Sequence, residues 1–289
     1  MLKYTAFIGY GFVGKACHKA FEHNTEAIII DPKYSETTIA NLPEYDCKLA
    51  FISINSPTLD DGSVDATAIY SIFQQLTDIK YTGFVVLKST LPPDIVHDLY
   101  VKYGSSINMD KVGPLRYIYS PEFLREGHWQ KDAVDPKFII LAGDYHDCDS
   151  LRELYKRHTS IPLYCRFFIV DYKEASLAKY TINAFLATKV AFMNQIYRLH
   201  MDAYGAESPM EPETWQTFID MVSADMRVGL SHMQVPGPDG QYGYGGSCLP
   251  KDIRAFIGFD KNDRLSILRE VEEANTMIRL TGINESDTI

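Results

Sequence analysis

The segment GYGGSCLPKD, residues 243–252, places a single cysteine among glycines and just before a proline. The glycines beside Cys248 carry no side chain that would shield its thiol, and Pro250 is typical of the first turn of a helix. A thiol at a helix N-terminus with Lys251 nearby is favoured as a nucleophile. A purely structural turn explains the same glycines, so the spacing alone leaves both interpretations open.

A second chemical pattern lies near the N-terminus, where Gly9, Gly11 and Gly14 form GxGxxG between an apolar run and a helical segment. In a dinucleotide-binding turn the first glycine permits the tight turn, the second lets the backbone approach the pyrophosphate, and the third permits close helix packing. Asp31 ends the next apolar run at about the expected 20 residues, where its carboxylate can bind ribose hydroxyls. Because a carboxylate repels a 2′-phosphate, the pattern favours NAD over NADP.

The remaining cysteines suggest no metal or disulfide chemistry. The chain has five cysteines, an odd number with no CxxC pair, which indicates a reducing compartment and argues against a disulfide framework or a zinc site. The histidines show neither HxxxH nor HExxH spacing, so we predict no metal. We expect Cys17, Cys47 and Cys165 to be small core residues, and Cys148, in the polar stretch DYHDCDS, to be exposed.

The composition excludes several classes of protein. Of the 289 residues, 46% are hydrophobic and 23% are charged, which is ordinary for a soluble globular protein. The formal net charge of -10 argues against nucleic-acid binding, because an acidic surface repels phosphates. No apolar run approaches the roughly 18 residues of a membrane span. No secretory signal is visible, so we expect a cytoplasmic protein.

The elements that must position these residues follow from the apolar pattern of the first half. Short apolar runs predict strands, and the amphipathic segments between them predict helices. The strand runs are TAFIG near Thr5, AIIID to Asp31, LAFISI to Ile54, FVVLKS to Ser89, RYIYS near Tyr117 and FIILAG near Ile140. They are continuously apolar, as in strands buried on both faces. We therefore predict an α/β fold in which residues 1–168 form a Rossmann-type doubly wound parallel sheet that binds NAD.

The pattern changes after Asp171. Residues 171–204 contain neither proline nor glycine and predict one helix of about 34 residues. Further helices are predicted near Thr214, Ile253 and Leu265. Apolar residues cover much of the long helix, so it needs burial on more than one side. We predict that residues 169–289 form an all-helical dimerisation domain built on this helix, with a second subunit packed along it.

The cysteine segment resembles the catalytic-cysteine signature of the nucleotide-sugar 6-dehydrogenases, the UDP-glucose and GDP-mannose dehydrogenase family. Other stretches resemble motifs of this family in the same order along nearly the whole chain. They are GYGFVG at Gly9, FISINSPT at Phe51, KSTLPP at Lys88, YSPEFLREG at Tyr119, AKYTINAFLA at Ala178 and DMRVG at Asp225. FISINSP and the cysteine segment look most similar to UDP-glucose dehydrogenases.

The resemblance implies the oxidation of a primary alcohol to a carboxylic acid with two NAD and two hydride transfers. The thiolate of Cys248 would add to the intermediate aldehyde as a thiohemiacetal, which gives up a second hydride and becomes a thioester. Water then releases the acid. UDP-glucose, oxidised to UDP-glucuronate, is the leading substrate, and GDP-mannose and UDP-aminosugars are the nearest alternatives.

The resemblance also assigns the other site residues. Lys179 and Asn183 lie four residues apart on the long helix, hence on one face, and would stabilise an oxygen that gains negative charge. Glu122 would transfer protons during thioester hydrolysis, and a catalytic water would be held by Thr90 and Asp252. Cofactor contacts, besides the glycine turn and Asp31, fall on Phe12, Val13, Asn55, Ser56, Ser89, Thr90, Glu126 and Lys251. Substrate contacts fall on Phe123, Leu124, Tyr244 and Gly245, with Lys179, Asn183 and Arg227.

Arg227, in DMRVG, resembles an arginine that enters the active site of the neighbouring subunit, which implies a homodimer. Two departures from the family keep alternatives open. A GPDG turn lengthens residues 230–242, where the family binds the nucleotide base, and the sequence ends at Ile289, before the second doubly wound domain that family members usually have. One alternative is an NAD-binding dimer that needs a separate C-terminal domain. Another is a two-electron β-hydroxyacid dehydrogenase, which needs no thiol.

Overall fold

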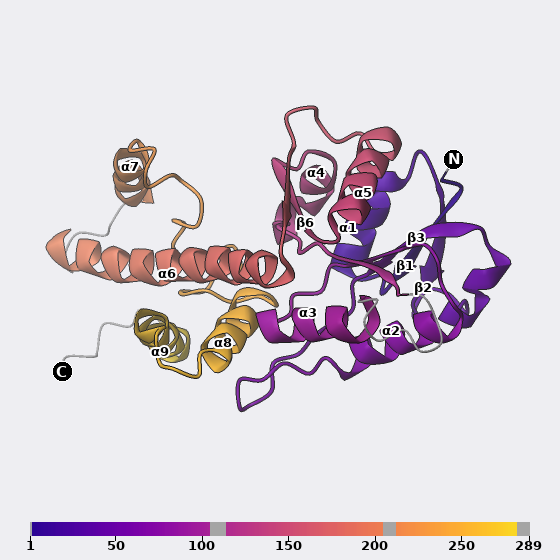
Figure 1. Ribbon diagram of the computed structural model, residues 1–289. Coiled ribbons are helices and arrows are strands. Elements are labelled where there is room, and N and C mark those ends of the chain that lie inside the picture. Colours follow the sequence, from indigo (N-terminus) through magenta and orange to yellow (C-terminus); the bar gives the residue numbers. More distant parts are fainter. Residues whose placement is uncertain (1, 105–113, 205–211, 282–289) are drawn as a thin grey trace. The chain divides into compact units, whose positions relative to one another are not determined.

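The computed structural model describes residues 2–104, 114–204 and 212–281 (Figure 1). The chain divides into two compact units. The first comprises Met1–Leu59 and Val64–Lys179, and the second comprises Asp60–Ser63 and Tyr180–Ile289. The boundary falls within one long helix, so the first turns of that helix belong with the sheet and the rest with the helical unit.

The first unit is built on one sheet, which has seven strands in the described part of the chain (Figure 1). The strands are β1 (Tyr4–Ile8), β2 (Glu26–Ile30), β3 (Cys47–Ile52), β4 (Phe84–Leu87), β5 (Arg116–Tyr119), β6 (Phe138–Gly143) and β7 (Arg166–Val170). Their order is β2-β1-β3-β4-β5-β6-β7, and all neighbours are parallel except β5 and β6. The order reverses between β1 and β3, whose carboxyl ends border the crevice where such sheets bind ligands.

Helices cover both faces of this sheet. They are α1 (Phe12–Phe21), α2 (Thr67–Asp78), α3 (Pro93–Leu99), α4 (Trp129–Val134) and α5 (Tyr145–His158), with the short helical turns η1 (Ile39–Glu44), η2 (Tyr100–Gly104) and η4 (Glu126–His128). In β3, Ala50 and Ile52 join an apolar cluster with residues of α2 and α3. Leu49 and Phe51 join the opposite cluster, with residues of α1 and α5. Burial of both faces explains why the strand sequences are continuously apolar.

The predicted doubly wound α/β fold is confirmed, with two differences in the sheet. The six predicted strands correspond to β1 to β6, and β7 was not predicted, because RFFIV begins with an exposed arginine and is only partly buried at the sheet edge. β6 runs antiparallel to β5, whereas a purely parallel sheet was expected. An apolar run does not encode strand direction. The boundary expected at residue 168 falls inside β7, so the sheet extends beyond it.

Cys148 is fully buried, so its predicted exposure is wrong. It shares one face of α5 with Leu151 and Tyr155, and all three belong to the apolar cluster between this helix and the sheet. The neighbouring polar residues of DYHDCDS occupy the other faces of the helix. The polarity of the stretch therefore reflected its solvent-facing side and not the position of the cysteine.

The second unit is helical. The long helix α6 (Tyr172–Tyr204) has 33 residues and confirms the predicted single helix, and α7 (Pro212–Ser223), α8 (Leu249–Phe259) and α9 (Ser266–Thr281) confirm the later ones. Met193 of α6 packs in one apolar cluster with Trp215 and Ile219 of α7 and with Val235 from the following loop. In the ranges that the structure describes, no helix is long and apolar enough to cross a membrane.

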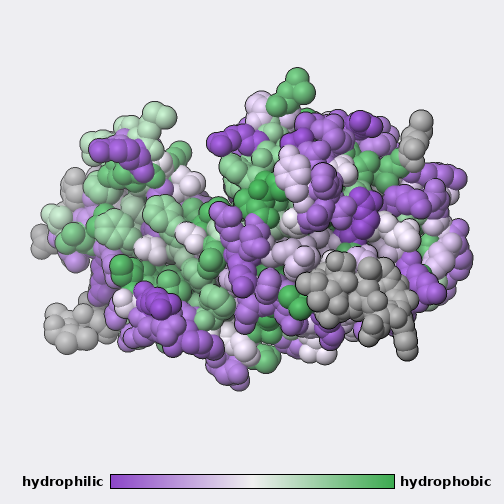
Figure 2. Space-filling view, viewed as in Figure 1, coloured by the Kyte–Doolittle hydropathy of each residue, from purple (hydrophilic) through white to green (hydrophobic). Residues whose placement is uncertain are grey.

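One face of α6 carries an exposed apolar row. Phe185, Phe192 and Leu199 are 67%, 56% and 63% exposed, and they follow one another at intervals of seven residues. Because seven residues make almost two helical turns, these side chains lie in one line along the helix. Hydrophobic residues gather over α6 on the face of the molecule that Figure 2 shows. An exposed row of this kind is typical of a surface that contacts another molecule.

Candidate active site

The glycine turn connects β1 to α1. Gly9 has a φ of +84°, and a Cβ on it would lie 2.7 Å from the carbonyl oxygen of Ser53, just after β3. A Cβ on Gly14 would overlap the carbonyl oxygen of Gly9, which already accepts a hydrogen bond from Ser53 Oγ at 2.8 Å. The protein's own close packing therefore requires the first and third glycines.

Gly11 is constrained differently. Apart from its chain neighbours, no atom of the described residues lies within 4 Å of the place where its Cβ would be. This open space borders the N-terminus of α1, where backbone N–H groups favour negative charge. The turn therefore fits a dinucleotide, because two glycines serve the fold and the remaining one leaves room for the pyrophosphate.

Asp31 follows β2 and faces this turn. Its Oδ2 accepts a hydrogen bond from the backbone N–H of Tyr10 at 2.8 Å, and its Oδ1 accepts one from the backbone N–H of Lys33 at 2.9 Å. These two bonds, assisted by the positive charges of Lys33 and Lys15, lower the pKa of Asp31. An ionised carboxylate thus stands beside the glycine turn, where the sequence predicted a ribose-binding group.

The loops after β3 and β4 carry four of the predicted cofactor residues. Ser89 Oγ donates to the carbonyl oxygen of Ile54 at 2.7 Å, and Ser56 Oγ donates to that of Thr90 at 2.9 Å. Ser56, Ser89 and Thr90 are buried, whereas Asn55 is exposed. The two serine hydroxyls therefore tie the loops together, and Asn55 presents its amide at the surface.

The aromatic residues of the predicted site have packing partners of their own. The ring of Phe12 meets Trp129 edge-on with 6.1 Å between centroids. The ring of Phe123 lies against Phe138 with 4.7 Å between centroids. Both contacts fix the rings against the chain that follows β5. The side chain of Glu126 lies outside the described part of the structure.

The first turns of α6 bring Lys179 to Glu122. Ser176 Oγ, in these first turns, donates to the carbonyl oxygen of Leu91 at 2.7 Å, a bond within the first unit. Lys179 Nζ donates to the backbone oxygen of Glu122 at 2.6 Å and to its Oε1 at 3.2 Å, and Leu124 N–H donates to Oε2 at 2.6 Å. The side chains of Lys179 and Glu122 are 4% and 10% exposed. Two predicted catalytic residues thus form a buried ion pair.

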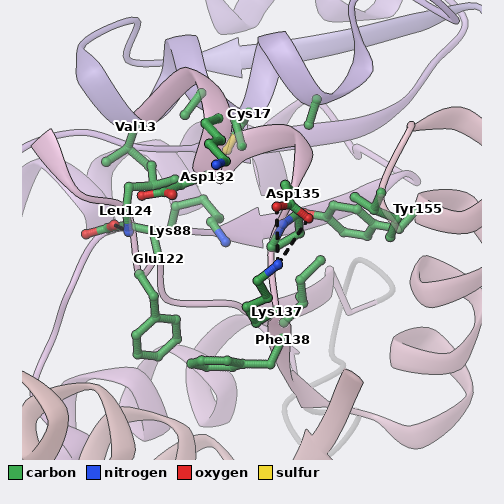
Figure 3. Close-up of a pocket in the computed structure, with 18 of the residues that line it drawn as sticks. Val13, Cys17, Lys88, Glu122, Leu124, Asp132, Asp135, Lys137, Phe138 and Tyr155 are labelled. Atoms are coloured by element: carbon green, nitrogen blue, oxygen red, sulfur yellow. Dashed lines mark hydrogen bonds and ion pairs between the residues drawn. The ribbon is translucent and has the colours of Figure 1, made fainter. Parts of the chain in front are cut away.

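A cavity of about 440 Å³ lies between α1 and the chain that follows β5 (Figure 3). Val13, Cys17, Lys88 and Glu122 are among its lining residues. Lys88 Nζ donates to Ser120 Oγ at 3.0 Å. Burial lowers the pKa of Lys88 and raises that of Cys17 to about 11. Sequence analysis gave Lys88 no role, although a lysine at the end of a buried strand was the available signal.

In the second unit, Cys248 immediately precedes α8 and is exposed. Asp252, one turn further, is buried, and its carboxylate accepts hydrogen bonds from Asn183 Nδ2 and Lys251 Nζ, each at 2.6 Å. The backbone N–H of Asp252 donates to the carbonyl oxygen of Cys248 at 2.9 Å, which closes the first turn of the helix. The structure thus groups Asp252, Asn183 and Lys251 at the same end of α8 as the cysteine.

Tyr244 and Gly245 were predicted to contact substrate, and the structure places both against α9. The ring of Tyr244 is buried, and its hydroxyl donates to Glu272 Oε2 at 2.5 Å. A Cβ on Gly245 would overlap the guanidinium of Arg279. Sequence analysis did not connect α9 with the site. The only available signal was the polar series Glu272, Asn275 and Arg279 on one face of an amphipathic helix.

Arg227 lies on the loop after α7. Its side chain is 89% exposed, and its guanidinium pairs with Asp225 at 2.5 Å. Lys189 Nζ, on α6, donates to the carbonyl oxygens of Val228 and Gly229 at 3.0 Å and 2.6 Å. The hydrogen bonds from Lys189 to the two residues after Arg227 therefore anchor the loop that carries its exposed guanidinium.

Comparison with known proteins connects both units with one family. The model described as UDP-glucose/GDP-mannose dehydrogenase family, NAD binding domain, matches residues 31–159. The model for the central domain of that family matches residues 173–277. The first match begins at Asp31, so the interpretation of the glycine turn rests on its own geometry.

Individual relatives agree with this family. The UDP-glucose 6-dehydrogenase of Rickettsia felis is 30% identical over 246 residues, which are 83% of this chain and 50% of the relative. The chain spans about half the length of the curated relatives that it matches.

Two solved structures resemble the fold. The UDP-glucose dehydrogenase of Pyrobaculum islandicum has a TM-score of 0.73 at 24% identity, over 96% of this chain and 69% of that one. The UDP-D-ManNAc dehydrogenase of Pyrococcus horikoshii has a TM-score of 0.74 at 16% identity, over 95% of this chain and 68% of that one. At these identities the likeness concerns the fold alone.

Proposed function

Because the chain belongs to the UDP-glucose/GDP-mannose dehydrogenase family, we propose that it oxidises the C6 alcohol of a nucleotide sugar to a carboxylate with two NAD. UDP-glucose is the first candidate substrate, since relatives such as the Rickettsia felis protein are named for it. The observation that carries the proposal is the arrangement at α8. Cys248 is exposed at its start, while Asp252, one turn on, is buried and bonded to Asn183 and Lys251. A cysteine with only a packing role would be buried.

The first unit belongs to the NAD-binding domain of the family, and NAD supplies hydride acceptance in each of the two oxidations. The open space at Gly11 takes the pyrophosphate, and Asp31 accepts hydrogen bonds from a ribose. The other cofactor contacts that we predict are Phe12, Val13, Asn55, Ser56, Ser89, Thr90, Glu126 and Lys251.

Cys248 provides the covalent chemistry. Its thiolate adds to the C6 aldehyde left by the first oxidation, and the new oxyanion takes up a proton to give a thiohemiacetal. Loss of a hydride and of the hydroxyl proton converts this adduct to a thioester. Water then attacks, the C–S bond breaks, and carboxylate and thiolate leave with two protons released. Lys179 and Asn183 donate to the oxygen as it gains charge, and Glu122 accepts protons during hydrolysis.

We assign the binding of the attacking water to Asp252 together with Thr90. An ionised carboxylate has about four acceptor positions on its two oxygens. Asn183 and Lys251 occupy two of them in this structure, so Asp252 retains acceptor capacity for a water. The bonds to Asn183 and Lys251 also restrict the rotation of the carboxylate, which orients the remaining lone pairs.

We also propose a homodimer that pairs along α6. The row of Phe185, Phe192 and Leu199 supports this proposal, since three large apolar side chains are exposed at heptad spacing. Arg227, on its anchored loop, is the residue proposed to enter the substrate site of the partner subunit. A Phe185→Glu/Phe192→Glu variant should sediment as a monomer. A dimer that persists in this variant would disprove pairing through the row.

The stoichiometry of NADH tests the proposed activity. Purified protein with limiting UDP-glucose and excess NAD should release two NADH per sugar, and Cys248→Ser should produce no acid. Tight NAD binding without NADH would instead support the second candidate, an NAD-binding dimer that needs a separate C-terminal domain. Turnover that survives Cys248→Ser would indicate a two-electron dehydrogenase. Parallel assays with GDP-mannose and UDP-aminosugars define the substrate.

A further inference from the structure

α9 presents three polar side chains to the loop that carries Cys248. Glu272, Asn275 and Arg279 are spaced by three and four residues, so they lie on one face of the helix. Each of them contacts Tyr244 through at least one hydrogen bond. Glu272 is bound in turn by Arg254 Nε of α8 at 2.9 Å. One face of α9 thus fixes Tyr244, which lies four positions before Cys248.

Asn275 binds the backbone of Tyr244 on both sides. Its Oδ1 accepts the Tyr244 N–H at 2.7 Å, and its Nδ2 donates to the Tyr244 carbonyl oxygen at 3.0 Å. Asn275 is buried, and a Cβ on Gly243, whose φ is +75°, would lie 2.5 Å from its Oδ1. Asn194 of α6 accepts the Gly243 N–H at 2.9 Å. The first glycine of the loop is therefore required by the approach of an amide side chain.

Arg279 joins the cysteine loop to the inserted GPDG turn. Its Nε donates to the Tyr244 carbonyl oxygen at 3.1 Å, its Nη1 to Gln241 Oε1 at 2.5 Å and its Nη2 to Asp239 Oδ2 at 2.8 Å. The guanidinium occupies the space that a side chain on Gly245 would fill. One cation thus reaches three acceptors on two segments, a geometry that suits the rigid fork of arginine.

The inserted turn has a defined structure of its own. Gly237 N–H donates to the Gln241 carbonyl oxygen at 2.8 Å, and Gly240 N–H donates to that of Gly237 at 2.9 Å. Partial burial opposes ionisation of Asp239, but hydrogen bonds from Arg279 and from the Gln241 backbone outweigh it and lower the pKa of Asp239. The turn is therefore held by its own backbone hydrogen bonds and presents an ionised carboxylate to Arg279.

Two of the three residues between Tyr244 and Cys248 are glycines. Gly245 and Gly246 have no side chains, and Gly246 has a φ of +77°. Glycine backbones are the most mobile, so the position of this segment depends on how its two ends are fixed. One end is the start of α8, and the other end is Tyr244, bound by α9.

We propose that Asn275 and Arg279 are positioning residues that fix the loop bearing Cys248, and that Arg279 couples this loop to the turn at residues 237–241. The consequence for turnover rests on the proposed function. The positioning itself does not, because the cysteine can be probed without substrate.

The first test measures how fast iodoacetamide alkylates Cys248 in the full chain, with the modified peptide identified by mass spectrometry. A thiol held at a helix N-terminus reacts faster than one released from it, so Arg279→Ala should slow the reaction about tenfold, and Asn275→Ala should slow it similarly. Arg269→Ala is the matched control. This arginine is also on α9, but it pairs with Asp263, in the connection between α8 and α9, with an N–O distance of 2.6 Å. An equal rate in Arg279→Ala and in the control would overturn the proposal.

The second test guards against a general loss of structure. Gly245→Ala puts a Cβ where the guanidinium lies, so it should displace Arg279 and slow alkylation as Arg279→Ala does. The Gly245→Ala/Arg279→Ala double variant should then be alkylated no more slowly than either single variant, because both changes break the same contact. Rates that fall multiplicatively in the double variant would show that Arg279 does not act through Gly245. If the alkylation results hold but no nucleotide sugar yields NADH, the proposed function fails and the positioning stands.

Discussion

The buried pair of Lys179 and Glu122 gives the sharpest prediction on stability. Lys179→Met removes the cation but leaves the Glu122 carboxylate, which is only 10% exposed and keeps its hydrogen bond from the Leu124 N–H. Breaking a buried ion pair by removing one partner costs about 3–5 kcal/mol, because the remaining charge is uncompensated. Glu122→Gln leaves the Lys179 ammonium, 4% exposed, without its anion, but it keeps the side-chain shape and the hydrogen bond of Lys179 to the backbone oxygen at 2.6 Å, so it should cost less than Lys179→Met.

The double variant separates pairing from packing. In Lys179→Met/Glu122→Gln no carboxylate remains buried without its cation, so the loss should be smaller than the sum of the single losses by about 1–3 kcal/mol. The assay is urea unfolding followed by Trp129 fluorescence in a Trp215→Phe background, because Trp129 is then the only tryptophan and lies in the first unit. Lys173→Met, at an exposed position of the same helix, should change stability by no more than about 0.5 kcal/mol. Additive losses in the double variant would refute a coupled buried pair.

Three further predictions follow from the glycine turn, the cysteines and Asp31. Gly11→Ala should weaken NAD binding by about tenfold or more in calorimetry and leave the melting temperature unchanged, whereas Gly14→Ala should destabilise the protein because its Cβ would overlap a backbone oxygen. Iodoacetamide at pH 8 should modify Cys248 before Cys17, because the pKa of Cys17 is raised to about 11; modification of Cys17 first would contradict this raised pKa. Asp31→Asn should be less stable than the parent at pH 7, and the difference should begin to shrink as the pH falls below about 4, because the folded-state pKa of Asp31 is lowered and its contribution is lost as the pH falls through that pKa. Unfolding curves with an unchanged difference at pH 3 and pH 7 would contradict that role.

The fold was predictable where the local pattern sufficed. β3 and β4 are continuously apolar because both of their faces are covered, and α6 lacks any proline or glycine that would end it. The direction of β6 and the existence of β7 were not predictable in this way. Both depend on pairing with strands distant in sequence, and β7 is a partly exposed edge strand.

The candidate site was predictable only in its separate parts. Spacing and resemblance identified Cys248, Lys179 and Glu122, but no local pattern indicates that Lys179 bonds both the backbone and the carboxylate of Glu122. Arg279 was missed for the same reason, because its acceptors lie 35 to 40 positions earlier in the chain. The glycines of the cysteine segment suggested that no side chain shields the thiol of Cys248, and no local pattern indicated that Arg279 of α9 fills the space beside Gly245.

The most direct measurement is the intact mass of the protein after it is mixed with UDP-glucose and NAD and quenched. In a Glu122→Gln variant, where thioester hydrolysis should be slow, we predict a sugar nucleotide covalently attached to the peptide that contains Cys248, and no such mass in Cys248→Ser. Release of two NADH per sugar from a chain whose Cys248 peptide stays unmodified at every quench time would contradict covalent catalysis by this cysteine.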